Sequence, residues 1–190
     1  MTRDIGTMSD TAYTLSELLQ IGVSSLLNML ADNGVLSLSA NHKNLLMWAH
    51  YTNNHYGMVL ELDSKSDFLD SADKVIYSNE RLCFDEIGKS KELKASLLYR
   101  NVFHKSSHWS YEEEWRVFHP WITKAPRAKP DIVGLMELPI DIIKNIYLGL
   151  RVTDSFKESA KEFCIQNKHI GLYQAKLHPT KYELEFISID

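Results

Sequence analysis

The sequence has little of several features that mark common protein classes. Two cysteines occur among 190 residues, Cys83 and Cys164, so we expect reduced thiols rather than a disulfide framework. The N-terminus is followed by no uninterrupted apolar run of signal-peptide type. Nowhere does the chain approach the ~18 consecutive apolar residues that a membrane helix needs. These absences predict a cytoplasmic protein that does not enter a membrane.

A strong excess of one charge is also absent. The formal net charge is −4 at pH 7, whereas a strong nonspecific nucleic-acid binder usually carries a basic surplus. Hydrophobic residues make up 44% and charged residues 24%, which is typical of a globular protein and not of a disordered one. We therefore expect no strong nonspecific binding to nucleic acid.

Motifs that identify an enzyme by spacing alone are missing as well. The sequence has no Walker loop, GxGxxG, GxSxG or Cys/His zinc spacing, and no internal repeat or Gly/Ser linker. Function must therefore be inferred from clusters of side chains.

Apolar periodicity predicts an α+β domain with a mixed, mostly antiparallel sheet and flanking helices. The first 13 residues are polar and are predicted to be a flexible N-terminus, and residues 14–190 are predicted to form a single domain. Helices are predicted at 14–33, 44–51, 89–103 and 154–166. Strands are predicted at 36–39, 58–62, 75–77, 111–121, 132–138, 146–148, 172–177 and 182–189.

The first candidate cluster lies on the predicted helix 44–51. Helical spacing puts Met47, His50 and Tyr51 on one face, with Trp48 beside Tyr51. One interpretation is ordinary packing of aromatic side chains in the core. The other is a pocket wall that stacks a planar ligand such as a nucleobase or nicotinamide ring, near polar Ser39.

The second candidate cluster is the acidic segment 109–116. On a strand, Glu112, Glu114 and Arg116 share one face, and Trp115 and Val117 are predicted to lie in the core on the other. The acidic face is either a solvated, self-neutralising row or a partly buried carboxylate site in which Arg116 keeps one carboxylate ionised.

A metal site is the weakest interpretation of this region. His104, His108 and Glu112 have the spacing of one helix face, but the strand-like residues that follow predict that the helix stops before Glu112. We therefore assign no metal ligands.

Several motifs in order carry a family resemblance. Residues 36–39 (LSLS), 46–51 (LMWAHY), 54–57 (NHYG) and 109–116 (WSYEEEWR), with 143–149 after them, resemble the domain of unknown function 2971 family from about residue 35 to the C-terminus. The N-terminal strand and "FNDPFE"-like turn of that family are missing, so we expect a shortened member or a fragment. Tyr56 also stands where the family has a lysine.

The resemblance implies no settled activity, and its layout is loosely similar to ADP-ribosyltransferase-like folds. In such a fold a glutamate grips the nicotinamide ribose, an aromatic ring stacks the nicotinamide, and NAD is the candidate cofactor. On this basis the candidate catalytic residues are Glu112, Glu114, His50 and Tyr51. The candidate cofactor-binding residues are Ser39, Trp48, His55 and Arg116.

Three functions remain open from the sequence. We expect a nucleotide or small-ligand sensor or binding module that acts with a protein partner, and the resemblance adds a leaning towards phage defence. The alternatives are an NAD-dependent transferase and a metal-dependent hydrolase or nuclease that uses Glu112 and Glu114. All depend on one geometric condition: the carboxylates must face the same hollow as the imidazole of His50 and the indole of Trp48.

Overall fold

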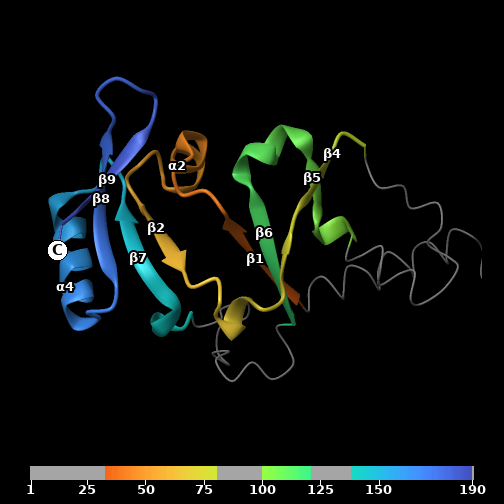
Figure 1. Cartoon of the computed structure of the whole chain (residues 1–190), viewed down its shortest axis with the longest axis horizontal. Coiled ribbons are helices and arrows are strands. Elements are labelled where there is room, and N and C mark those ends of the chain that lie inside the picture. The colour runs from red at the N-terminus through yellow and green to blue at the C-terminus, as the bar shows by residue number, and fades with distance from the viewer. Residues whose placement is uncertain (1–32, 81–99, 121–137, 190) are drawn as a thin grey trace, which may run out of the picture.

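The computed structural model describes residues 33–80, 100–120 and 138–189, and over these residues it has the predicted α+β architecture (Figure 1). A three-stranded antiparallel sheet has the order β1-β6-β3, formed by Asn33–Ser39, Glu114–Pro120 and Ala72–Lys74. A four-stranded sheet has the order β2-β7-β8-β9, formed by Met58–Leu62, Ile143–Leu148, Gly171–Leu177 and Leu184–Ser188. A small parallel pair joins β4 (Ile76–Ser78) to β5 (His104–Ser106).

Short helices connect these strands. The α-helices are α2 (Leu45–Tyr51) and α4 (Asp154–Gln166), and the 3-10 helices are η1 (Asp67–Leu69), η2 (Ser107–Glu112) and η3 (Ile140–Ile142). Of these helices, none is long and apolar enough to span a membrane, within the described residues.

Helix α4 connects the two parallel strands of the larger sheet. Its N-cap is Thr153, whose hydroxyl accepts the backbone N–H of Phe156. Because β7 and β8 are parallel, their connection must cross over the sheet, and α4 makes that crossover. The helix covers one face, where Ile146, Leu148 and Leu172 are buried with Ala160 (Figure 1).

Helix α2 packs one large side chain against the opposite face of the larger sheet. Asn44 caps α2, because its side chain accepts the N–H groups of Leu46 and Met47. Trp48 packs from α2 against Tyr147 of this sheet. This contact fixes α2 against the larger sheet.

Within the described residues, β1 and β2 are both edge strands of the two larger sheets. β1 pairs with β6 only, and β2 pairs with β7 only. The N–H of Ala40 bonds to the carbonyl of Glu113, and antiparallel alternation then turns the backbone groups of Ser37 and Ser39 away from β6. The same alternation turns the backbone of Leu60 away from β7.

The acidic segment differs from its predicted conformation. The strand predicted at 111–121 begins at Glu114, because residues 107–112 form η2 and Glu113 has a left-handed φ of 46°. The prediction that Trp115 lies in the core was wrong, since its side chain is 37% exposed. Val117 is buried as predicted.

Other predicted elements fall partly or wholly outside the described residues. These are the flexible N-terminus at 1–13, the helix at 14–33, most of the helix at 89–103, and the strand at 132–138 except Leu138. Cys83 also lies outside them. The predicted strands at 58–62, 146–148 and 172–177 and the C-terminal hairpin are confirmed.

Candidate functional site

Two buried carboxylates meet at one lysine. Glu112 comes from the end of η2 and Glu114 from the start of β6, and their residues are 2% and 5% exposed. The Nζ of Lys105 on β5 forms an ion pair with Oε2 of Glu112 and lies 3.0 Å from Oε2 of Glu114. The left-handed turn at Glu113 lets both carboxylates reach the same cation.

Arg116 completes this ion cluster. Its Nε and Nη2 donate to the two carboxylate oxygens of Glu114 at 2.8 and 3.0 Å, and Nη1 donates to the carbonyl of Val102. Burial raises the pKa of Glu114, but hydrogen bonds from Arg116, Ser37 and Lys105 outweigh it and hold the pKa below its ordinary value. The two acids and two bases thus balance in charge.

Tyr51 is the predicted α2 residue that reaches the carboxylates. Its hydroxyl donates to Oε1 of Glu112 at 2.8 Å, and this bond is the main cause of a raised tyrosine pKa. The ring itself is 61% exposed. Tyr51 therefore connects the buried ion cluster to the molecular surface.

Polar side chains fasten the loop after β1 to η2. The hydroxyl of Ser39 donates to the carbonyl of Glu112 at 2.7 Å, and Nδ2 of Asn44 donates to the carbonyl of Tyr111 at 2.8 Å. Ser39 was predicted to hold ligand oxygens, but its hydroxyl donates its hydrogen bond to the backbone of the acidic segment.

His50 lies in an aromatic patch on the outer side of α2. Its ring centroid is 6.3–6.5 Å from those of Tyr51, Trp109 and Tyr111. The ammonium of Lys105 lies 5.2 Å from the centroid of Trp109. His50 therefore neighbours the ion cluster through aromatic contacts, and none of the hydrogen bonds described for the ion cluster involves it.

Trp48 and His55 lie apart from the carboxylates. Trp48 is 1% exposed, and its Nε1 donates to the carbonyl of His42 at 2.6 Å. The ring of His55 stacks on it at 5.8 Å, and burial lowers the pKa of that imidazole. The core interpretation fits Trp48. The expectation that the carboxylates share one hollow with the His50 imidazole and the Trp48 indole is not met, because Tyr51 is the α2 side chain that bonds to Glu112.

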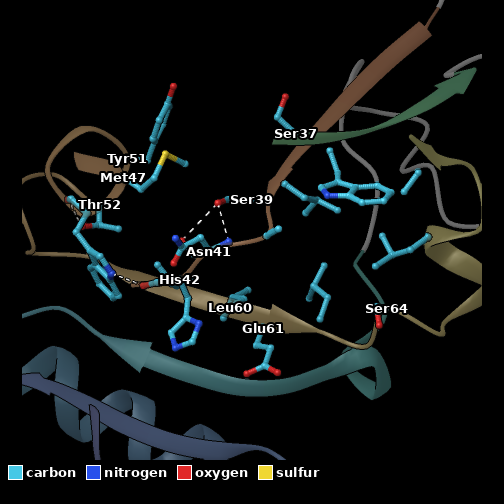
Figure 2. Close-up of a pocket in the computed structure, with 18 of the residues that line it drawn as sticks. Ser37, Ser39, Asn41, His42, Met47, Tyr51, Thr52, Leu60, Glu61 and Ser64 are labelled. Carbon is cyan, nitrogen blue, oxygen red and sulfur yellow. Dashed lines mark hydrogen bonds between the residues drawn. The ribbon is translucent and has the colours of Figure 1, made fainter. Parts of the chain in front are cut away.

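A cleft of about 830 Å³ lies between the unpaired edges of β1 and β2 (Figure 2). One wall comes from β1 and the loop after it, another from α2, and a third from β2 and residues 64–72. Aromatic and polar side chains that line it include Tyr51, Trp115, Ser37, Asn41, His42 and Glu61. The carboxylates of Glu112 and Glu114 are not part of its lining.

Glu61 forms a second polar cluster at this cleft, which the sequence prediction missed. Nδ2 of Asn145 and the hydroxyl of Tyr147 donate to its Oε2 at 2.7 and 2.6 Å. These two bonds, led by that from Tyr147, hold the pKa of Glu61 below its ordinary value. His42 stacks on Tyr147 with ring centroids 4.6 Å apart.

The sequence feature that could have revealed Glu61 is a single charged residue within an apolar strand, MVLEL at 58–62. The partners on β7 come from more than 80 residues away in sequence, so no local spacing reveals them.

The residues weighed as metal ligands do not gather. His104 bonds to the carbonyl of Arg100, and Nδ1 of His108 lies 2.9 Å from the hydroxyl of Ser106. Among residues 33–80, 100–120 and 138–189, no group of three or more His, Cys, Asp or Glu side chains is placed to hold a metal ion.

The fold and site define an α+β domain in which a ligand-sized cleft adjoins a buried, charge-balanced ion cluster. A family model described as "Protein of unknown function (DUF2971)" matches residues 47–117, and this match confirms the resemblance to that family. The matched region holds Tyr51, Glu61 and the whole ion cluster. No curated protein and no solved structure matched the chain.

Proposed function

We propose that this protein is a binding module for a small, ring-bearing molecule, which occupies the cleft between β1 and β2. The observation that carries the proposal is the cleft itself. Its volume of about 830 Å³ falls within the ~300–1,000 Å³ of typical ligand pockets. Apolar walls with a few polar groups are also typical of such pockets.

The aromatic side chains support a planar ligand. Trp115 and Tyr51 line the cleft, and both leave part of their apolar ring surface exposed to water. Packing in the core would have buried that surface, so its exposure at a cleft favours a role in binding. A nucleobase or nicotinamide ring that stacked on either side chain would remove that surface from water.

The carboxylates favour binding over group transfer. A transferase needs a glutamate that is free to reach a ribose. Glu114 already accepts from Arg116 and Lys105, and Glu112 from Lys105 and Tyr51. This arrangement supports a structural role for the ion cluster, which fixes Tyr51 at the edge of the cleft. Action beside a partner protein stays a prediction from the sequence, and a role in phage defence stays a prediction from the resemblance.

The test is ligand-observed NMR with adenosine and nicotinamide on the full chain. Ala40 lines the cleft and is exposed, so Ala40→Trp should fill the cleft without disturbing the core. Ser159→Trp, at an exposed position on α4, is the matched control. We expect binding of at least one probe to wild type and the control, and its loss in Ala40→Trp.

Two outcomes would count against this function. Binding that survives in Ala40→Trp would place the ligand elsewhere. Turnover of NAD by the isolated chain, abolished by Glu114→Gln, would favour the transferase instead.

A further inference from the structure

Glu61 presents an unused hydrogen-bond acceptor to the cleft. Both of its donors, Asn145 and Tyr147, bond to Oε2. Among the described residues, no side chain donates a hydrogen bond to Oε1. Glu61 lines the cleft and is only partly buried. An ionised carboxylate has about four acceptor positions, so Oε1 can still receive a donor from a ligand.

The cleft is acidic rather than basic. Its lining contains Glu61 and Asp70 and, among the described residues, no lysine or arginine. Burial, followed by the nearby charge of Lys43, lowers the pKa of His42 from 6.5, so that imidazole is neutral at pH 7. A cationic group would be attracted to this lining, and an anionic one repelled.

The hydroxyls of Ser37 and Ser39 and the cations nearest the cleft are already engaged. The hydroxyl of Ser39 donates to the Glu112 backbone, and that of Ser37 bonds to Glu114. The nearby cations Lys105 and Arg116 are held in ion pairs with carboxylates. A phosphate in the cleft would therefore lose its hydration without gaining charged partners.

We infer that the cleft selects ring-bearing ligands that carry a cationic or hydrogen-bond-donating group, which Glu61 receives, and discriminates against phosphorylated or carboxylated ones. This inference rests on the proposed function, because it names the chemical class of ligand for the same cleft.

Three probes of equal size and different charge test the inference. Benzamidine is cationic, benzamide neutral and benzoate anionic, and all present the same ring. Affinities are measured by ligand-observed NMR titration of the full chain at pH 7. We expect benzamidine to bind about tenfold more tightly than benzamide, as one charge-assisted hydrogen bond provides, and benzoate to bind most weakly.

Glu61→Gln should remove the preference for benzamidine while benzamide binding changes less than about twofold, because the shape of the cleft is kept. The matched control is Asp63→Asn, which removes the same charge just after β2. Asp63 pairs with Lys144 at 2.9 Å and does not line the cleft. This control should retain the wild-type order of affinities.

The outcomes separate the two claims. If none of these probes and neither adenosine nor nicotinamide binds, the binding function fails; if adenosine or nicotinamide binds but none of these probes does, the charge selection is overturned and the binding function stands. Suppose that the probes bind to wild type and not to Ala40→Trp, but that the affinity for benzoate equals or exceeds that for benzamidine. The charge selection is then overturned, and the binding function stands. The selection is equally overturned if Glu61→Gln keeps the preference, or if Asp63→Asn loses it.

Discussion

Removing Lys105 should destabilise the protein because it leaves the buried carboxylate of Glu112 without a cation. In Lys105→Met, Glu114 keeps Arg116, but Glu112 is left with the Tyr51 hydroxyl as its hydrogen-bond donor among the described side chains. Breaking a buried ion pair on one side typically costs ~3–5 kcal/mol. Because the Lys105 side chain is 22% exposed and water can enter in its place, we expect a smaller cost than that range, about 2–3 kcal/mol.

A second substitution should reverse much of this loss. Glu112→Gln in the Lys105→Met background removes the stranded charge and leaves an acceptor for the Tyr51 hydroxyl. The double variant should therefore be more stable than Lys105→Met alone, with a coupling free energy above about 1 kcal/mol. Lys161→Met is the matched control, since Lys161 pairs with Glu158 on the surface of α4, and it should cost less than about 0.5 kcal/mol.

The measurement is urea denaturation followed by far-ultraviolet circular dichroism on wild type, Lys105→Met, Glu112→Gln, the double variant and Lys161→Met. The reasoning is refuted if Lys105→Met costs no more than Lys161→Met. It is refuted as well if the double variant is less stable than Lys105→Met, because the carboxylate would then be stabilising without its cation.

Three further predictions follow from the same geometry. Tyr51→Phe should cost about 0.5–1 kcal/mol of stability at neutral pH. The raised pKa of Tyr51 contributes stability below pH 10 that is lost as pH rises, so the variant should lose less stability than wild type in alkali. Glu114→Gln should make the free energy of unfolding fall less steeply in acid, by up to about 1.4 kcal/mol per pH unit. The lowered pKa of Glu114 contributes stability above pH 4.5, and this contribution disappears as pH falls through the folded-state pKa. Gly149→Ala should cost about 2–3 kcal/mol in urea denaturation, since a Cβ there would lie 2.2 Å from the carbonyl oxygen of His55.

Each of these has a control of the same chemistry. Tyr182→Phe changes a tyrosine that is 98% exposed, and Glu113→Gln changes an exposed carboxylate next to Glu114. Gly57→Ala places its Cβ 3.2 Å from the carbonyl of Thr52, a milder contact than that at Gly149. A variant that behaves like its control would contradict the corresponding prediction.

The sequence predicted most of the strands because alternation and turn residues are local signals. Helix α2 was also predictable, since Asn44 is a good N-cap residue just before its first turn. The parallel pairing of β7 with β8 depends on the crossover through α4, and a local pattern does not determine which strands become neighbours.

The proximity of Glu112 and Glu114 was predicted for a mistaken reason. Strand alternation was used to place Glu112 and Glu114 on one face, whereas the left-handed turn at Glu113 brings them together. Their main partner, Lys105, lies on a separate strand, so the acidic segment alone could not reveal it. Trp48 was ambiguous because a buried indole and a ligand-stacking indole have the same helical spacing.

The central claim is that a small molecule binds between the unpaired edges of β1 and β2, and amide chemical-shift mapping tests it most directly. Titration of the isotope-labelled chain with benzamidine should shift the backbone amides of residues 37–41 and 58–62, with the change at Glu61 among the largest. Shifts confined to the aromatic patch around His50 and Trp109, or no shifts at saturating benzamidine, would contradict the claim.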